Sequence, residues 1–350
     1  MEELTMVTYP EKIGNEEQLE ELLSRPSAEV IEMFSRLDGD LMFLGVSGKI
    51  GQSLARMAKR ACDEAGIKKR IIGVALFENK EQQNKIEKYG IETINGDLLD
   101  KNFTNSLPTP RNVFFLAGMK FGSIDNLAMT WAVNSYLPAI VADHFKHSRI
   151  VAFSTGCVYP LVPVESRGSV ETDVPVAIGE YAQSCLGRER MFEYNSIKNK
   201  TEVTLIRLNY SVEMRYGVLV DIALKVKNNQ PVDLTMGYFN VIWQGDMNNF
   251  VLRSLEHVKN PAKILNITGP EILSVSEVAK EFGKLFGVKP VLVNKEAPTA
   301  LLSNSEQAFG LFGQPKVTIN QVIKWIAGWI KDDKELLGKP THFEVRDGKY

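Results

Sequence analysis

The sequence has few cysteines and no long apolar run. Its three cysteines, Cys62, Cys157 and Cys185, are too few and too scattered for a disulfide framework or a zinc site. No stretch approaches the ~20 consecutive apolar residues that a membrane-spanning helix requires. The acidic, polar N-terminus does not match a secretory signal. We therefore expect a cytoplasmic protein with no membrane partner.

The chain also lacks an excess of charge of either sign. Lys and Arg number 41 and Asp and Glu number 43, which gives a net charge of −2. This balance gives no electrostatic reason to expect nucleic acid as a partner. Histidine is scarce as well. His144 and His147 follow Asp143 at the end of an expected helix, where no third ligand is visible, and we expect no metal site.

The most informative stretch is residues 41–51, LMFLGVSGKIG. A short apolar run leads into three glycines spaced G-x-x-G-x-x-G, and a helical pattern follows at once. In dinucleotide-binding folds the first glycine permits the turn, the second lets the backbone approach the pyrophosphate, and the third lets the helix pack on the strand. The helix N-terminus then offers free N–H groups to phosphates. The expected cofactor contacts are Gly45, Gly48, Lys49, Ile50 and Gly51.

Apolar segments alternate with helical ones from residue 40 to residue 209. The expected strands are 41–46, 70–77, 91–94, 112–116, 149–154 and 202–209, and the expected helices are 52–65, 80–89, 126–146 and 180–198. Strands without apolar–polar alternation are typical of a parallel sheet covered on both faces. This order of elements predicts an α/β fold, a doubly wound Rossmann-type parallel sheet.

The remaining residues predict a smaller C-terminal substrate domain, interleaved with the first. Three helices are expected in it. The first covers 218–227, the second begins at a capping box at Ser274–Glu277, and the third covers 319–330. The expected division is a helical extension without chemistry (1–39), a dinucleotide-binding domain (40–209 and 239–268), a substrate domain (210–238 and 269–335) and a polar tail (336–350).

Four further motifs fall at the expected strand ends or on the helix after them. They are NGDLLD at 95–100, LAGMKFG at 116–122, FSTGCVY at 153–159 and YAQSC at 181–185. Together with the glycine turn they resemble the extended short-chain dehydrogenase/reductases, the NAD-dependent epimerase/dehydratase type. The second motif is similar to a stretch of UDP-galactose 4-epimerases. The resemblance covers about residues 40–330.

The resemblance implies where cofactor and substrate bind. It places Asp97 at the adenine, and it places the Tyr of a Tyr-x-x-x-Lys motif and a Thr at the reacting carbon. The implied catalytic residues are Thr155, Tyr181 and Cys185. The other implied cofactor contacts are Leu98, Leu116, Ala117, Gly118, Lys120 and Asn134, and the implied substrate contacts are Lys120, Cys157, Asn209 and Arg215.

The chemistry follows from the side chains. Hydride transfer at a hydroxyl-bearing carbon needs a group that takes the hydroxyl proton and a donor that holds the oxygen. Tyr181 can do the first if nearby positive charge lowers its pKa of ~10, and Thr155 can do the second. The family Lys is Cys185 here, and a neutral thiol supplies no charge. Arg188, on the same helical face, or Lys120 could supply it.

The cofactor and the assembly follow from two further features. Glu78, near the end of the second strand, would bind a ribose diol and repel a 2′-phosphate, so we favour NAD over NADP. By the resemblance, helices 126–146 and 180–198 would pair with those of a second copy in a four-helix bundle. The expected assembly is a homodimer.

Three functions remain open on the sequence. The first is an NAD(P)-dependent oxidoreductase of the epimerase/dehydratase type, acting on a sugar, sugar acid or nucleotide sugar. The second is a simple dehydrogenase with exchangeable cofactor, and the third is a non-catalytic dinucleotide-binding protein, because Cys185 replaces the Lys. Gly156 and Cys157 stand where 4,6-dehydratases carry Asp-Glu. Residues 210–215 replace the usual nucleotide-sugar loop, so a smaller, non-nucleotide substrate is also open.

Overall fold

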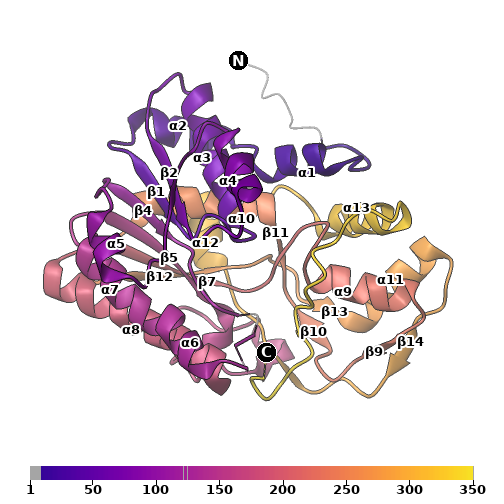
Figure 1. Cartoon of the computed structure of the whole chain (residues 1–350). Coiled ribbons are helices and arrows are strands. Elements are labelled where there is room, and N and C mark those ends of the chain that lie inside the picture. Colours follow the sequence, from indigo (N-terminus) through magenta and orange to yellow (C-terminus); the bar gives the residue numbers. More distant parts are fainter. Residues whose placement is uncertain (1–8, 121, 124, 350) are drawn as a thin grey trace.

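The computed structural model describes residues 9–120, 122, 123 and 125–349 (Figure 1). Its centre is a parallel sheet in the strand order β12-β7-β5-β4-β1-β2-β3. The strands are β1 (Leu41–Leu44), β2 (Ile71–Ala75), β3 (Glu92–Asn95), β4 (Asn112–Phe115), β5 (Arg149–Thr155), β7 (Val203–Leu208) and β12 (Lys263–Ile267). The chain order reverses between β1 and β4, and ligands of open parallel sheets bind outside the carboxyl ends of the strands at such a point. The predicted doubly wound α/β sheet is confirmed.

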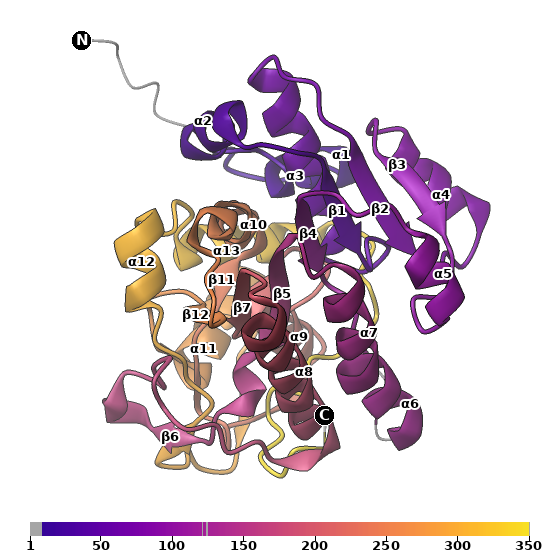
Figure 2. The same cartoon turned by 90° about the vertical axis from the view of Figure 1, so that its left-hand side faces the viewer.

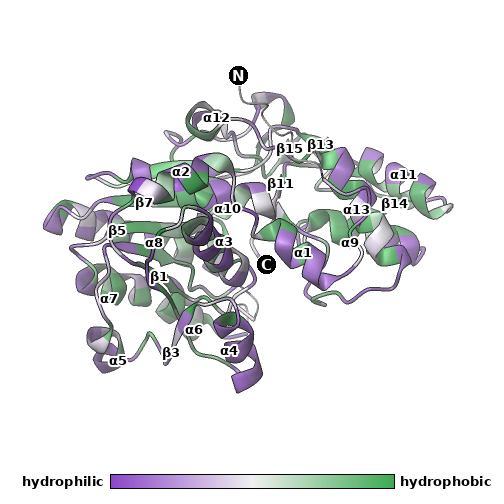
Figure 3. Cartoon of the chain, turned by 90° about the horizontal axis from the view of Figure 1, so that it is seen from above, coloured by the Kyte–Doolittle hydropathy of each residue, from purple (hydrophilic) through white to green (hydrophobic). Residues whose placement is uncertain are grey.

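Helices cover both faces of the sheet, as Figure 2 shows. Alternate residues of β1 point to opposite faces, so that Phe43 joins one hydrophobic core and Leu44 the other. The first core is covered by α2 (Ala28–Arg36), α3 (Gly51–Glu64), α4 (Lys80–Glu87) and α10 (Gln244–Arg253). The second is covered by α5 (Lys101–Ser106), α7 (Leu137–His144) and α8 (Gly179–Asn199), and α6 (Leu127–Trp131) packs on α8. Figure 3 shows the polar character of α4, which lies at the surface.

The helix expected at residues 126–146 is interrupted by a π-helical turn, Ala132–Tyr136, between α6 and α7. Asn134 lies in this turn and is fully buried, and its side chain hydrogen-bonds to both backbone groups of Met119. Such turns occur frequently at functional sites. Side-chain periodicity does not signal a single inserted residue, so the sequence predicted a regular helix.

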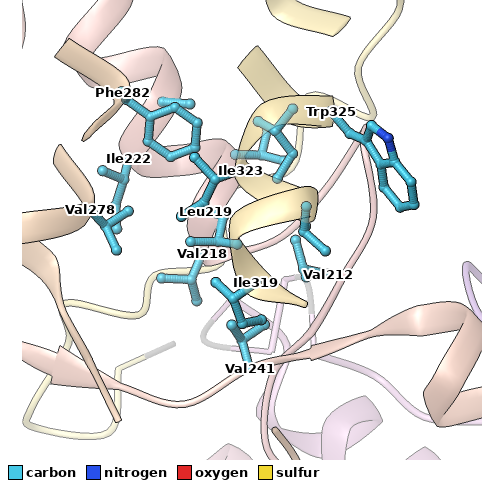
Figure 4. Close-up of a cluster of buried hydrophobic side chains, with 14 of the residues drawn as sticks. Val212, Val218, Leu219, Ile222, Val241, Val278, Phe282, Ile319, Ile323 and Trp325 are labelled. Carbon is cyan, nitrogen blue, oxygen red and sulfur yellow. The ribbon is translucent and has the colours of Figure 1, made fainter. Parts of the chain in front are cut away.

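A smaller C-terminal lobe is built around α9 (Val218–Lys227), α11 (Val275–Phe286) and α13 (Ile319–Lys331). Their apolar faces meet in one core, which contains Leu219, Phe282 and Trp325 (Figure 4). Trp325 and Trp329 are both buried, as their spacing of one helical turn predicted. The short strands β9 (Pro231–Asp233) and β14 (Val291–Val293) pair beside this core. Minor pairs join β6 (Val162–Pro163) to β15 (Thr299–Ala300), β8 (Ser211–Val212) to β11 (Ile242–Trp243), and β10 (Tyr238–Phe239) to β13 (Leu273–Ser274).

The N-terminal extension joins the two parts of the molecule. Helix α1 (Glu16–Leu23), capped by Asn15, buries Leu19 and Leu23 in the core of the lobe. Helix α2, capped by Ser27, buries Phe34 in the sheet core. The remaining helix, α12 (Glu306–Phe312), packs on the same sheet core. Within the described chain, no helix has the length and apolar character needed to span a membrane.

Residues 336–349, here called the C-terminal strap, dock on the lobe and cross to the sheet. Thr341 donates its backbone N–H and its hydroxyl to Asp221, at 2.8 and 2.6 Å. Phe343 is buried against Phe239, with ring centroids 6.1 Å apart. Figure 1 shows this last segment running between the two parts of the molecule. The segment expected as a polar tail is therefore a docked part of the fold.

Candidate active site

A cavity of about 670 Å³ opens at the carboxyl ends of the central strands. It is lined by the glycine turn, by the segments after β2, β4, β5 and β7, by α8 and by the strap. The lining residues are Gly45, Ser47, Gly48, Lys49, Ile50, Gly51, Gln52, Leu76, Glu78, Gln82, Leu116, Gly118, Lys120, Phe153, Ser154, Thr155, Cys157, Tyr181, Arg188, Leu208, Asn209, Tyr210, Ser211, Tyr216, Leu337, Lys339 and Thr341.

The glycine turn is shaped for close backbone approach. Gly45 has φ +90°, and a Cβ on it would lie 2.7 Å from the amide nitrogen of Ala117. A Cβ on Gly51 would lie 2.6 Å from the carbonyl oxygen of Val46, so only glycine lets α3 pack on β1. A Cβ on Gly48 would meet no atom closer than 3.4 Å, because Gly48 borders the open cavity. The Gly51 N–H bonds to the Gly48 carbonyl at 3.1 Å, and no side chain caps α3, so other N–H groups of its first turn can bind a phosphate.

Asn134 fixes the segment after β4 through hydrogen bonds to its backbone. Its Oδ1 accepts from the Met119 amide at 2.9 Å, and its Nδ2 donates to the Met119 carbonyl at 2.9 Å and to Ser184 Oγ at 3.1 Å. Asn134 lies outside the cavity lining, so its predicted role at the cofactor is one of positioning the backbone that carries Gly118 and Lys120.

Thr155 and Tyr181 line the same cavity, as the resemblance predicted. Thr155 Oγ1 accepts a hydrogen bond from the Cys157 amide at 3.1 Å. The hydroxyl of Tyr181 hydrogen-bonds to the thiol of Cys185, one turn further along α8. Burial raises the pKa of Tyr181 well above its ordinary value, and the two neighbouring cysteines raise it further. The phenol is therefore protonated at neutral pH.

The two cations expected to replace the family Lys both lie at this site. The Arg188 guanidinium donates to the Phe153 carbonyl at 2.9 Å and to Asn134 Oδ1 at 2.6 Å, and its charge lowers the pKa of Tyr181. This effect is smaller than that of burial. Lys120 Nζ donates to the Thr341 carbonyl of the strap at 3.1 Å, and its charge interacts with Cys157 and Cys185.

Lys49, predicted as a residue of the phosphate turn, reaches across the cavity. Its Nζ lies 3.5 Å from Ser211 Oγ and 4.2 Å from the centre of the Tyr216 ring, both beyond β7. Burial lowers the pKa of Lys49 to about 8. Glu213 opposes that shift, and the charges of Lys120 and Arg215 add to it.

The two ends of the predicted cofactor site differ. Glu78 and Gln82 line the cavity beyond β2, and Leu116 lines it after β4. Asp97 and Leu98 lie outside the lining. The exposed Asp97 accepts from the Leu99 amide at 2.9 Å and Leu98 is buried, so their contact with adenine stays a prediction.

The predicted substrate residues are placed in two different ways. Cys157 and Asn209 line the cavity, and Asn209 donates to Asn240 Oδ1 at 2.7 Å. Arg215 lies outside this lining, because its guanidinium is held by Glu20 at 2.8 Å and by Glu213 at 3.2 Å. It borders a second cavity of about 480 Å³ instead.

A buried polar network supports the site from behind and was not predicted. Arg207 of β7 forms a two-pronged ion pair with Glu189 of α8, at 3.0 and 2.7 Å, and both side chains are almost fully buried. Ser154 donates to Glu189 at 2.5 Å, next to Thr155 in the chain. Arg207 also donates to the Tyr159 hydroxyl at 2.7 Å. An arginine inside the apolar run of β7 was the available signal, because a buried charge requires a partner.

Other site chemistry is not indicated by the residues in view. No group of three or more His, Cys, Asp or Glu side chains that could hold a metal ion occurs in the described part of the chain. The three cysteines are free and buried.

Comparison with known proteins identifies the fold. No protein-family model matches the sequence, and no curated protein matches it. Among solved structures, UDP-glucose 4-epimerase from Thermotoga maritima with UDP-glucose has 18% identity and a TM-score of 0.69, over 84% of this chain and 99% of that one. UDP-glucuronic acid 4-epimerase from Bacillus cereus, with UDP-glucuronic acid and NAD, has 15% identity and a TM-score of 0.68, over 84% and 99%. An epimerase from Methanothermobacter thermautotrophicus has 18% identity and a TM-score of 0.68, over 88% and 97%. The chain shares the fold of these epimerases.

Proposed function

We propose that this chain, built on the fold of the nucleotide-sugar epimerases, is an NAD-dependent oxidoreductase of the epimerase/dehydratase type that acts on a sugar-type substrate. The observation that carries the proposal is the common cavity, in which Thr155 and Tyr181 face the glycine turn around Gly48. A dinucleotide at that turn would bring its reactive end toward the carboxyl ends of β4 and β5.

The residues present fit NAD. Gly45 and Gly48 leave room for the pyrophosphate, and the uncapped start of α3 offers it N–H groups. Glu78 at the other end of the cavity suits a ribose diol better than a 2′-phosphate. The B. cereus epimerase of the same fold binds NAD. NAD supplies the chemistry of hydride acceptance and return.

The chain's own residues handle the proton. Tyr181 holds its phenolic proton in the ligand-free protein, so it can donate to a substrate oxygen, and it becomes a base when its pKa is lowered. The positive charge of Arg188 acts in that direction. Thr155 offers a hydroxyl that can hold the reacting oxygen. Cys157 and Asn209 border the space where the substrate would lie.

A non-catalytic dinucleotide-binding protein is the second candidate. The Tyr181–Cys185 hydrogen bond favours it, because a cation would be expected at Cys185 and the raised pKa of Tyr181 opposes proton removal. A simple dehydrogenase with exchangeable cofactor would use the same residues and differs in how tightly the cofactor is kept.

We also propose a homodimer that acts in the cytoplasm. Exposed apolar side chains gather on α6, the π turn and α8: Leu127, Met129, Trp131, Tyr136, Tyr194 and Ile197. Exposed apolar side chains on several adjoining elements are typical of a protein interface. The free cysteines agree with a reducing compartment.

The proposal is tested on the purified full-length chain. Nucleotide released by denaturation is identified by chromatography, NAD binding is titrated, and sugars, sugar acids and nucleotide sugars are screened for turnover. Retained NAD with turnover that Tyr181→Phe removes would support an epimerase, and exchangeable NAD would support a dehydrogenase. NAD binding without turnover, with activity created by Cys185→Lys, would support the non-catalytic protein.

A further inference from the structure

The charged side chains along the cavity are unevenly distributed. Among the described residues that line it, the single carboxylate is Glu78, beyond β2. The cations come from the glycine turn, the segment after β4, α8 and the strap: Lys49, Lys120, Arg188 and Lys339. The two negative charges of a dinucleotide pyrophosphate would balance only part of this positive charge. The part of the cavity away from Glu78 is therefore suited to a further anion.

Lys49 and Lys120 are the cations best placed for that anion. The Lys49 ammonium lies against Ser211 and Tyr216, in the segment that follows β7. The Glu213 carboxylate acts on the Lys49 charge but is itself held by the Arg215 guanidinium at 3.2 Å. Each lysine has a pKa lowered mainly by burial, and the charge of Lys120 adds to the shift at Lys49. An anion between the two ammonium groups would replace repulsion by attraction.

The strap limits how large the substrate can be. Leu337, Lys339 and Thr341 form one wall of the cavity. This wall is fixed on the lobe by the Thr341–Asp221 hydrogen bonds and on the sheet side by the contact of Lys120 with the Thr341 carbonyl. At its far end Gly348 packs against Gly179, where a Cβ on Gly179 would lie 2.3 Å from the Gly348 carbonyl oxygen.

The volume of the cavity also limits the size of the substrate. A cavity of about 670 Å³ lies within the range that binds one drug-sized ligand. Here the same cavity has to hold a dinucleotide as well as a substrate. The space that remains beside Thr155 and Tyr181 suits a small molecule better than one that carries a second nucleotide.

We infer that the substrate is a small hydroxyl-bearing molecule with a carboxylate or phosphate group, such as a sugar acid or sugar phosphate, and that Lys49 and Lys120 bind this group beneath the strap. The inference rests on the proposed function and narrows its substrate to anions without a nucleotide. The acidic group anchors the molecule, and its hydroxyl-bearing carbon then faces Thr155 and Tyr181.

The test uses the NAD-saturated full-length protein and isothermal titration calorimetry. The probes are matched panels of hexoses, hexuronates, hexose 6-phosphates and UDP-hexoses. We expect a hexuronate or a hexose 6-phosphate to bind at least about tenfold more tightly than the neutral hexose, and UDP-hexoses to bind no better than the hexose. The panel that binds distinguishes a carboxylate from a phosphate.

Two variants and a matched control locate the anion. Lys49→Gln and Lys120→Gln should each weaken the anionic probe about tenfold, a larger loss than either variant causes in NAD binding. Lys349→Gln, an exposed lysine of the strap that pairs with Asp347, should change neither. Circular dichroism checks that each variant is folded.

Several results would overturn the inference alone: tightest binding by a UDP-hexose, equal binding of neutral and anionic probes, no binding of any anionic probe at millimolar concentration, or an effect of Lys49→Gln on NAD only. Failure of the unmodified protein to bind NAD would instead overturn the proposed function, and this inference with it. The NAD titration made first tells the two failures apart.

Discussion

The Tyr181 hydroxyl and the Cys185 thiol form a hydrogen bond along one turn of α8, and Tyr181 lines the same cavity as the glycine turn. Burial raises the pKa of both groups, that of Cys185 to about 11. The pair is therefore neutral at pH 7. A lysine at position 185 would replace a neutral partner by a positive one.

The first prediction concerns the pH dependence of turnover. The phenolate of Tyr181 forms only above its raised pKa, so the rate should still rise with pH where an ordinary tyrosine would be half ionised. Cys185→Lys should lower that pKa by about one to three units, which moves the rise to lower pH and increases the rate at pH 7.

Tyr181→Phe should remove turnover. Cys185→Ala, which removes the thiol without adding charge, is the control and should move the profile to lower pH by less than Cys185→Lys, because it removes only what the thiol adds to the Tyr181 pKa. Full turnover by Tyr181→Phe would contradict the assignment.

The second prediction separates the glycines of the turn. Gly48→Val should fold and lose NAD binding, because its side chain fills cavity space where the pyrophosphate belongs. Gly51→Ala should lower the free energy of unfolding by about 1–3 kcal/mol, because its Cβ meets the Val46 backbone. Gly310→Ala, where a Cβ meets nothing within 4 Å, should do neither. Calorimetry and urea unfolding measure the two effects. Unchanged NAD affinity in folded Gly48→Val would remove the turn from the cofactor site.

The third prediction concerns the choice between NAD and NADP. Glu78→Ser should raise the affinity for NADP relative to NAD about tenfold, or ~1.4 kcal/mol, because a like charge no longer faces a 2′-phosphate. Glu81→Ser changes an exposed carboxylate of α4 outside the cavity lining and should leave the ratio unchanged. Both ratios are obtained by titration. An unaltered preference in Glu78→Ser would show that Glu78 points away from the ribose.

The fourth prediction concerns the ion pair behind the site. Glu189→Gln leaves the Arg207 charge buried without its partner, and it should lower the free energy of unfolding by about 3–5 kcal/mol. Glu256→Gln breaks the exposed pair with Arg36 and should cost about 0–1 kcal/mol. Urea unfolding compares the two. Equal losses would mean that burial does not determine the strength of the inner pair.

The fifth prediction concerns assembly. Light scattering at micromolar concentration should give the mass of a dimer. Ile197→Glu, on the exposed apolar surface of α8, should yield a monomer. Val291→Glu, an exposed apolar residue of β14 in the lobe, should remain dimeric. A monomer for the unmodified chain would refute the predicted helix bundle.

The sheet and its turn were predictable because local sequence determines them. Continuous apolar runs gave the sheet strands β1 to β5 and β7 to within about two residues, and the glycine spacing located Gly45 and Gly51 where a Cβ cannot fit. The order of motifs also brought Thr155 and Tyr181 to one cavity.

What the sequence did not predict depends on contacts between distant residues. The strap has no periodic pattern, and it docks through Phe343 and through Thr341, whose partner Asp221 lies far away in the chain. Arg215 was predicted to contact the substrate, but its guanidinium pairs with Glu20, which comes from the distant N-terminal extension. The burial that sets the pKa of Tyr181 likewise arises from several segments at once.

The two ties between the lobe and the sheet part bear on how quickly a ligand can leave. Helix α1, which packs in the core of the lobe, is joined to α3 of the sheet part by the ion pair of Glu21 with Arg60, and the strap is seated against Gly179 through Gly348. A rotation of the lobe away from the sheet would break the contact at α1 or the contact of the strap with Gly179. Release of a bound ligand therefore requires the strap to detach locally. A dinucleotide bound here should have a long residence time and survive gel filtration, whatever its equilibrium affinity.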